Sequence, residues 1–164
     1  MYRFTYSNYV VSLHGAEELD DDNLSILDLE NILLTSQIVA RQRDRQTREV
    51  KCVVRGFILD GRPADASSSS ARLETSLSSP STSPDVICAS CGRPGVLLRR
   101  VSRSFGRGRS LLVIEGVPMC SCPHCAASYF TAQTMHEIER IKALRKSVAV
   151  DRQVPVAMFR ELCA

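Results

Sequence analysis

The sequence contains no tryptophan, and only 5% of its residues are aromatic, so any hydrophobic core is expected to be small. It also lacks an apolar run of the roughly 18 residues that a membrane-spanning helix needs, which argues against a membrane protein. Its first residues lack the basic stretch and the apolar core of a secretory signal peptide. Together these features predict a cytoplasmic protein.

The net charge of +3 is small, but the charges are unevenly distributed along the chain. Residues 1–84 contain 9 basic and 12 acidic residues, whereas residues 85–164 contain 12 basic and 6 acidic residues. An acidic half joined to a basic half indicates two modules with different partners, or two modules that bind each other.

The stretch 64–85 has few apolar residues and is rich in serine, proline and threonine. This composition is typical of a disordered linker, because it offers too little apolar surface to offset the entropy lost on folding. The linker would separate a first domain at residues 1–63 from a second domain at residues 86–164.

The first domain is expected to contain two helices. A helix within residues 6–20 is predicted by the helical spacing of Val10, Val11, His14 and Glu18. The motif S-x-x-D at Ser25 and Asp28 predicts the start of a second helix, because the serine oxygen caps free N–H groups and the carboxylate lies at the positive helix end.

Two strands are expected to follow, at residues 37–44 and 49–59, with a bulge near Gly56. The turn formed by residues 60–62 would normally lead into a third strand. No third strand is expected, because the Ser-rich stretch lacks core residues, and the first domain therefore looks incomplete.

The second domain is expected to contain a β-hairpin, a helix and a short strand. Residues 99–103 and 110–115 would form the hairpin, with its turn at residues 106–108. A capping box at residues 134–137 predicts a helix that ends near Lys146. A short strand is expected at residues 154–159.

Four of the seven cysteines form two C-x-x-C pairs, separated by thirty residues: Cys88, Cys91, Cys122 and Cys125. Each pair places two thiolates on one tight turn, and two such turns complete the tetrahedral coordination of one Zn²⁺ ion. The spacing therefore predicts a structural zinc site. A thioredoxin-like redox pair, an iron–sulfur cluster and disulfides are the alternatives.

Other residues near the two pairs leave the ligand set partly open. Cys120 is a competing ligand, although the symmetrical arrangement uses Cys122 and makes Cys120 a spare thiol. His124 is expected to be a residue of the turn and not a ligand. Gly92 is expected to adopt a positive φ that lets backbone N–H groups point at sulfur. The fold class predicted is therefore α+β: an incomplete ααββ domain, a linker and a zinc ribbon with a helix.

These motifs resemble the YgiT-type (MqsA-like) zinc-finger family over residues 86–160. The resemblance rests on C-x-x-C-G at Cys88, a basic hairpin, Val117-Pro118, the second C-x-x-C, and S-Y-F before a helix. In that family the zinc is structural and the finger belongs to bacterial antitoxins that bind toxin proteins. The family pattern has a glycine where this chain has Ala126. No helix-turn-helix domain follows here, so operator binding is not implied.

Residues 1–62 resemble a family of small uncharacterised bacterial domains that are similar to MqsR/RelE-type ribonuclease toxins. The matching stretches are residues 12–16, residues 24–29 and the D-G-R at residues 60–62. The apolar strands that normally end that domain are missing. Serine codons of the form TCN, read one base earlier, become NTC, which encodes only Phe, Leu, Ile or Val. Our hypothesis is therefore that the Ser-rich stretch is the frameshifted end of the toxin-like domain, and serine codons of the AGY type at residues 67–70 would contradict it.

Weak catalytic candidates for RNA cleavage are His14, Arg43 and Arg55, because an imidazole can deprotonate a 2′-hydroxyl and cations stabilise the phosphorane. The truncated domain is nevertheless expected to be inactive. The hairpin offers a cluster of arginines for an acidic protein or for nucleic acid: Arg99, Arg100, Arg103, Arg107 and Arg109. The favoured prediction is a zinc-binding antitoxin-like protein with a toxin partner. An RNA-cleaving toxin restrained by its own finger and a nucleic-acid-binding zinc ribbon are the alternatives.

Overall fold

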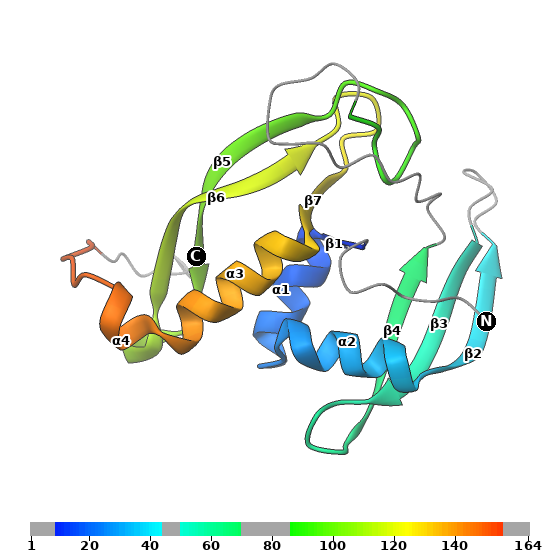
Figure 1. The fold of residues 1–164 in the computed structure, drawn as a ribbon, viewed down its shortest axis with the longest axis horizontal. Helices are drawn as coiled ribbons and strands as arrows, with labels where there is room; N and C mark the ends of the chain where they lie inside the picture. Colours follow the sequence, from blue (N-terminus) through cyan, green and yellow to red (C-terminus); the bar gives the residue numbers. More distant parts are fainter. Residues whose placement is uncertain (1–8, 44–49, 70–85, 156–164) are drawn as a thin grey trace, which may run out of the picture.

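The computed structural model describes residues 9–43, 50–69 and 86–155 and has a mixed α+β fold with two antiparallel sheets (Figure 1). One sheet has four strands in the order β1-β7-β6-β5, and the other has three strands in the order β2-β3-β4. The strands are β1 (Val10–Ser12), β2 (Gln37–Arg43), β3 (Val50–Phe57), β4 (Pro63–Ser69), β5 (Leu97–Phe105), β6 (Leu112–Ser121) and β7 (Ser128–Thr131). The helices are α1 (Leu13–Asp21), α2 (Ile26–Thr35), α3 (Ala132–Ala143) and α4 (Arg145–Val148), with a 3₁₀ turn at Gly108–Ser110.

The first helix is shorter than predicted, because its expected first turns form a strand instead. Val10–Ser12 make up β1, which pairs antiparallel with β7. Helix α1 then starts at Leu13, because the Ser12 side chain accepts a hydrogen bond from the Gly15 N–H at 3.0 Å and caps the helix. Pairing with a distant strand has overridden the helical spacing here. Residues 6–8 lie outside the described residues.

The predicted cap of the second helix is confirmed. The Ser25 hydroxyl accepts a hydrogen bond from the Asp28 N–H at 3.1 Å, and the Asp28 carboxylate accepts one from the Ser25 N–H at 2.9 Å. The same carboxylate also accepts a hydrogen bond from the Leu59 N–H, just after β3, at 3.0 Å. Asp28 therefore joins the start of α2 to the end of β3.

This geometry predicts that Asp28→Asn destabilises the protein by about 1 kcal/mol at neutral pH. Burial opposes ionisation of the carboxyl, but the hydrogen bonds from Ser25 and Leu59 hold the pKa of Asp28 below its ordinary value. A lowered pKa in the folded state contributes stability above the unfolded pKa, which is lost as the pH falls through the folded value.

Urea denaturation of wild type and Asp28→Asn at pH 7 and at about pH 3 measures this contribution. The gap between the two proteins is expected to shrink at the lower pH. Asp22→Asn is the matched control, because Asp22 is exposed at the C-terminal end of α1 and its substitution is expected to change the stability little. A gap that is equal at both pH values would contradict the assignment.

A third strand is present, and the prediction that none follows residue 62 was wrong. Strand β4 pairs with β3 from Phe57 opposite Pro63 to Lys51 opposite Ser69. The pairing uses backbone hydrogen bonds, which need no apolar side chains, and Gly61 provides the positive φ of the preceding turn. An ion pair between Arg55 and Asp65, 2.7 Å from Nε to Oδ1, links the two strands. Residues 70–85 of the expected linker lie outside the described residues.

The bulge predicted near Gly56 lies elsewhere, in β2 between Ile38 and Ala40. Gly56 instead passes directly beneath α2. A Cβ atom at this position would lie 2.2 Å from the Ile32 carbonyl oxygen, so only glycine permits this close approach of helix to strand. The glycine therefore serves packing and not a change of register.

The predicted hairpin is confirmed as β5 and β6, which turn at residues 106–111. The helix after it begins earlier than predicted, because Thr131 and not Thr134 is its N-cap and accepts a hydrogen bond from the Thr134 N–H at 3.2 Å. The strand expected at 154–159 is not seen at residues 154–155, and its other residues lie outside the described part of the chain.

The two halves of the chain share one hydrophobic core. Val11, Ala16 and Ile26 from the first half pack in the same buried cluster as seven residues of the second half: Phe105, Leu112, Ile114, Val117, Phe130, Met135 and Ile138. The N-terminal residues thus complete both the sheet and the core that the hairpin begins. Within the described residues, no helix is long and apolar enough to cross a membrane.

Candidate metal centre

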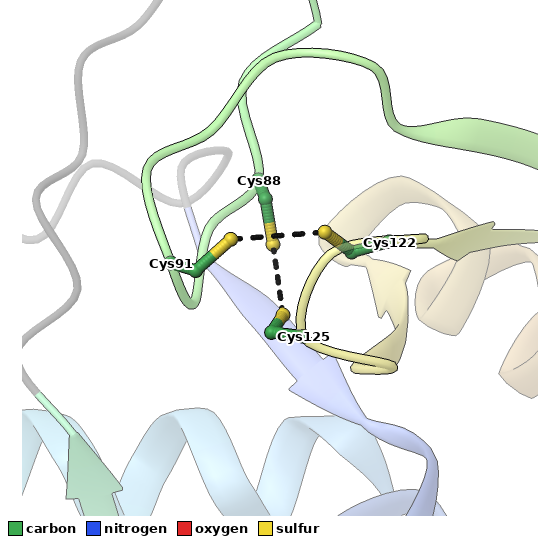
Figure 2. A group of neighbouring side chains, drawn as sticks. All are labelled: Cys88, Cys91, Cys122 and Cys125. Atoms are coloured by element: carbon green, nitrogen blue, oxygen red, sulfur yellow. Dashed lines mark hydrogen bonds between the residues drawn. The ribbon is translucent and has the colours of Figure 1, made fainter. Parts of the chain in front are cut away.

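The four predicted cysteine ligands meet at one point, although they come from two separated segments (Figure 2). Cys88 and Cys91 lie in the turn before β5, and Cys122 and Cys125 lie in the turn between β6 and β7. The four Sγ atoms all lie within 4.8 Å of one another. The sequence spacing therefore identified a set of thiols that the fold does bring together.

The sulfur positions match those of a tetrahedral metal site. Cys88 Sγ lies 3.8 Å from Cys125 Sγ, and Cys91 Sγ lies 3.7 Å from Cys122 Sγ. A tetrahedron with metal–sulfur bonds of about 2.3 Å has sulfur–sulfur edges of roughly 3.8 Å. All four cysteines are free thiols. The four cysteines can therefore hold a metal ion.

Each turn contributes one buried and one exposed cysteine. Cys88 and Cys122 are almost fully buried and pack with Tyr129, whereas Cys91 and Cys125 are exposed. The site is consequently anchored in a small apolar cluster on its inner side, while its outer side faces the solvent. A metal bound here would tie two surface turns to the sheet beneath them.

Backbone N–H groups in both turns point at the sulfur atoms, as predicted. The Ser90 N–H donates to Cys88 Sγ at 3.4 Å. In the second turn, the N–H groups of Cys125 and His124 lower the pKa of Cys122 to about 6. Such hydrogen bonds stabilise thiolate, which is the form that binds a metal.

The two turns reach this geometry with different residues. Gly92 has a φ of +69°, as predicted, and Ala126 in the second turn has a φ of +59°. The left-handed region costs a residue with a Cβ atom roughly 1–2 kcal/mol. The replacement of glycine by Ala126, inferred from the family resemblance, therefore falls at a position where glycine would be favoured.

We expect Ala126→Gly to stabilise the protein by about 1 kcal/mol, because relief of this strain exceeds the greater entropy of glycine in the unfolded chain. Thermal melts with the metal present measure the change. Ala127→Gly is the matched control, because Ala127 has no positive φ and the substitution should be destabilising. A lower melting temperature for Ala126→Gly would contradict this account of the turn.

Cys120, the competing ligand, does not belong to the group of four. It lies in β6 opposite Leu98 and Tyr129, and it packs beside Cys88 and Cys122. Burial raises the pKa of its thiol, which disfavours the thiolate form. Its position is that of a small apolar residue in the cluster that supports the site.

Metal stoichiometry of serine variants distinguishes Cys120 from Cys122. Cys120→Ser is expected to retain one metal ion for each chain, whereas Cys122→Ser is expected to lose most of the bound metal because a thiolate ligand is removed. Elemental analysis and metal-edge spectroscopy of the purified variants measure this. Full binding by Cys122→Ser, with loss in Cys120→Ser, would reverse the assignment.

The three weak catalytic candidates do not form a common site. His14 is largely exposed on α1 and lies 3.2 Å from Glu18, one helical turn along. Arg43 lies opposite Val50 and Arg55 lies opposite Gln37, so these arginines are at opposite ends of the β2–β3 ladder. Arg55 is also paired with Asp65. The described residues therefore provide no constellation for RNA cleavage around these groups.

The arginines of the hairpin cluster fall into two groups: some bind other groups of the chain, and others are exposed to solvent. Arg103 and Arg107 form ion pairs with acidic residues of α1, and Arg100 donates to the Gly116 carbonyl oxygen at 3.1 Å. Arg99 and Arg109 are exposed. The acidic first half of the chain is thus a partner of the basic second half.

A buried polar cluster that the sequence did not reveal also connects the halves. Glu30 in α2 is buried, and its Oε1 atom accepts a hydrogen bond from the Tyr9 hydroxyl at 2.6 Å. His136 Nε2 in α3 lies 2.9 Å from the same oxygen. The sequence contained a sign that Glu30 is buried, because this residue lies one turn after Ile26 on the apolar face of its helix.

Comparisons of the chain with models of protein families, with curated proteins and with solved structures find no match. The chemistry of the site follows from its own geometry. Four protein thiols fill all the positions of a tetrahedral ion, so the arrangement suits a metal that stabilises the fold and leaves no position for a reacting water molecule.

Proposed function

We propose that the chain is a zinc-binding interaction protein of the toxin–antitoxin class, in which a zinc-finger module binds and neutralises a toxin protein. The observation that carries the proposal is the cluster of Cys88, Cys91, Cys122 and Cys125. The ion is Zn²⁺ in a structural role, and the zinc module consists of residues 86–148.

The donor set supports zinc over most other metals. Soft thiolates in a tetrahedral arrangement favour Zn²⁺ or iron–sulfur chemistry, whereas Mg²⁺ and Ca²⁺ prefer oxygen ligands. The sulfur–sulfur distances of 3.7 and 3.8 Å suit a single ion. Purified protein is expected to be colourless and to contain one zinc ion, whereas a visible absorption band would identify an iron–sulfur centre.

The partner is supported by the YgiT-type resemblance and by the nature of the surface. Of the motifs that carry the resemblance, Val117-Pro118 lies in β6 and Phe130 lies in β7, directly before α3. The hairpin already holds acidic residues of α1 through Arg103 and Arg107. A protein with an acidic surface is therefore the favoured ligand of this module.

Co-purification tests the proposed function. The full chain is co-expressed with an intact RelE/MqsR-like toxin, and an equimolar complex is expected, together with rescue of growth. Cys88→Ser should lose the complex because the zinc module no longer folds. Cys52→Ser is the control, because Cys52 lies in β3 away from the cluster. A zinc-loaded chain that neither binds nor neutralises such toxins would refute the antitoxin role.

A further inference from the structure

The zinc module has a docking surface that the chain itself occupies. We define this surface as the edge of β7 that pairs with β1, together with Arg103, Arg107 and Lys142. Residues 9–21, here called the N-terminal segment, lie on it as an extended strand followed by helix α1. Figure 1 shows β1 and α1 lying against β7 and α3.

The strand part of the contact completes an open sheet edge. Val10, Val11 and Ser12 lie opposite Thr131, Phe130 and Tyr129 of β7. The Ala132 N–H also donates to the Tyr9 carbonyl oxygen at 3.2 Å. Strand β1 is the outermost strand of its sheet, so without it β7 would present unpaired backbone groups. This edge accepts an added strand from a peptide chain.

The helical part of the contact is electrostatic. Three acidic residues on one face of α1 each meet a cationic residue of the zinc module, in the pairs Glu17–Arg103 at 3.0 Å, Asp21–Arg107 at 2.7 Å and Asp20–Lys142 at 3.7 Å. Asp20 also accepts a hydrogen bond from the Gly106 N–H at the hairpin turn, at 3.2 Å. The surface thus matches an acidic helix that follows a strand.

An apolar contact connects the strand part and the helical part. Val11 and Ala16 from the segment are buried in the same cluster as Phe130 and Met135 of the zinc module. A strand of three residues and one short helix form this contact, and its ion pairs are partly exposed to solvent, where each contributes about 1 kcal/mol or less. A contact of this size can open without unfolding the whole protein.

We propose that this surface is the partner-binding surface of the zinc module, held closed in cis by the N-terminal segment. The proposal rests on the proposed function and adds its regulation. An outside protein with the same chemistry, an extended strand followed by an acidic amphipathic helix, binds there by displacing residues 9–21. Weakening the cis contact therefore strengthens binding in trans.

A labelled synthetic peptide with the sequence of residues 9–35 is the probe, titrated into the zinc-loaded full chain and followed by fluorescence anisotropy. In the double variant Glu17→Arg, Asp20→Arg the cis contact is weakened, so the peptide is expected to bind roughly tenfold tighter than to wild type. Asp22→Arg is the matched control at the same helix end and should bind like wild type. Circular dichroism and zinc content confirm that each variant is folded.

Charge reversal on the other side of the contact gives a second measurement. The single variant Glu17→Arg is expected to bind the peptide more tightly than wild type. When Arg103→Glu is added to it, an ion pair forms again within the chain, and the affinity for the peptide is expected to return towards the wild-type value. Equal peptide affinity for wild type, the double variant and the control would overturn the proposal, as would affinity that is indifferent to Arg103→Glu.

The outcome separates this inference from the proposed function. A toxin complex that forms with equal affinity in wild type and in the Glu17→Arg, Asp20→Arg variant would refute the docking surface and leave the antitoxin role standing. Peptide binding that follows the predicted order, without any toxin complex, would support the surface and refute the antitoxin role.

Discussion

Removal of the metal is expected to unfold the zinc module and to release the N-terminal segment. The turn from Cys122 to Ala127, closed by the Cys122 N–H donating to the Ala127 carbonyl oxygen at 2.9 Å, leads directly into β7. In the described part of the chain, β1 pairs with β7 alone, and β7 joins it to the rest of its sheet. Loss of the second turn therefore removes the edge on which β1 rests.

The expected effect is large because structural zinc contributes about 10–16 kcal/mol of apparent binding free energy in small zinc-finger modules. This equals or exceeds the stability of most domains, which is about 5–15 kcal/mol. The apolar cluster behind the site is small, since its buried members among the described residues are Tyr129, Cys88 and Cys122. Packing around the two turns is therefore expected to be too weak to hold them in place without a metal ion.

Hydrogen exchange and circular dichroism before and after addition of a zinc chelator measure this effect. Protection is expected to fall in β5, β6, β7 and β1, and adding zinc back should restore it. Cys88→Ser should behave like the chelated protein, whereas Cys52→Ser should keep the zinc-dependent transition. An unchanged melt after complete removal of zinc would show that the metal does not hold the fold together.

Phe130→Ala is expected to destabilise the protein by about 3–5 kcal/mol, the usual cost of truncating a fully buried phenylalanine. Phe130 is only 1% exposed and is the largest fully buried side chain among the described residues. It lies in β7 opposite Val11 of β1, within the cluster that both halves share. Its loss would leave a cavity where the two halves meet.

Phe57→Ala is the matched control, because Phe57 is 50% exposed on β3 and its truncation is expected to cost less than about 1 kcal/mol. Urea denaturation of both variants, with zinc present, gives the two free energies of unfolding. Similar losses for Phe130→Ala and Phe57→Ala would contradict the shared core.

Features set by neighbouring residues could be predicted from the sequence. The Ser25–Asp28 capping box forms because both groups lie within one turn of the same helix. The hairpin and its turn follow from the glycines between a basic strand and an apolar strand. Each C-x-x-C pair places its own thiols together, since the spacing itself brings them to one side of a turn.

Features that depend on residues far apart in the sequence could not be predicted. Val10–Ser12 were predicted as helix, and only the pairing with β7 makes them a strand. Strand β4 has almost no apolar side chains, so nothing in its composition indicated the backbone pairing with β3. The position of Glu30 on the apolar face of its helix suggested burial, but only the packing of α3 placed His136 beside it.

The sequence by itself determined which four cysteines form the two C-x-x-C pairs and the charge of each half, because residue type, spacing and charge are properties of the sequence. The tertiary structure alone decided that Cys120 is not one of the four grouped thiols and that α1 lies against the arginines of the hairpin. It also decided that the two halves share a sheet and a core. These features depend on which strand edges pair and which apolar faces pack together. Both are decided only when the whole chain has folded.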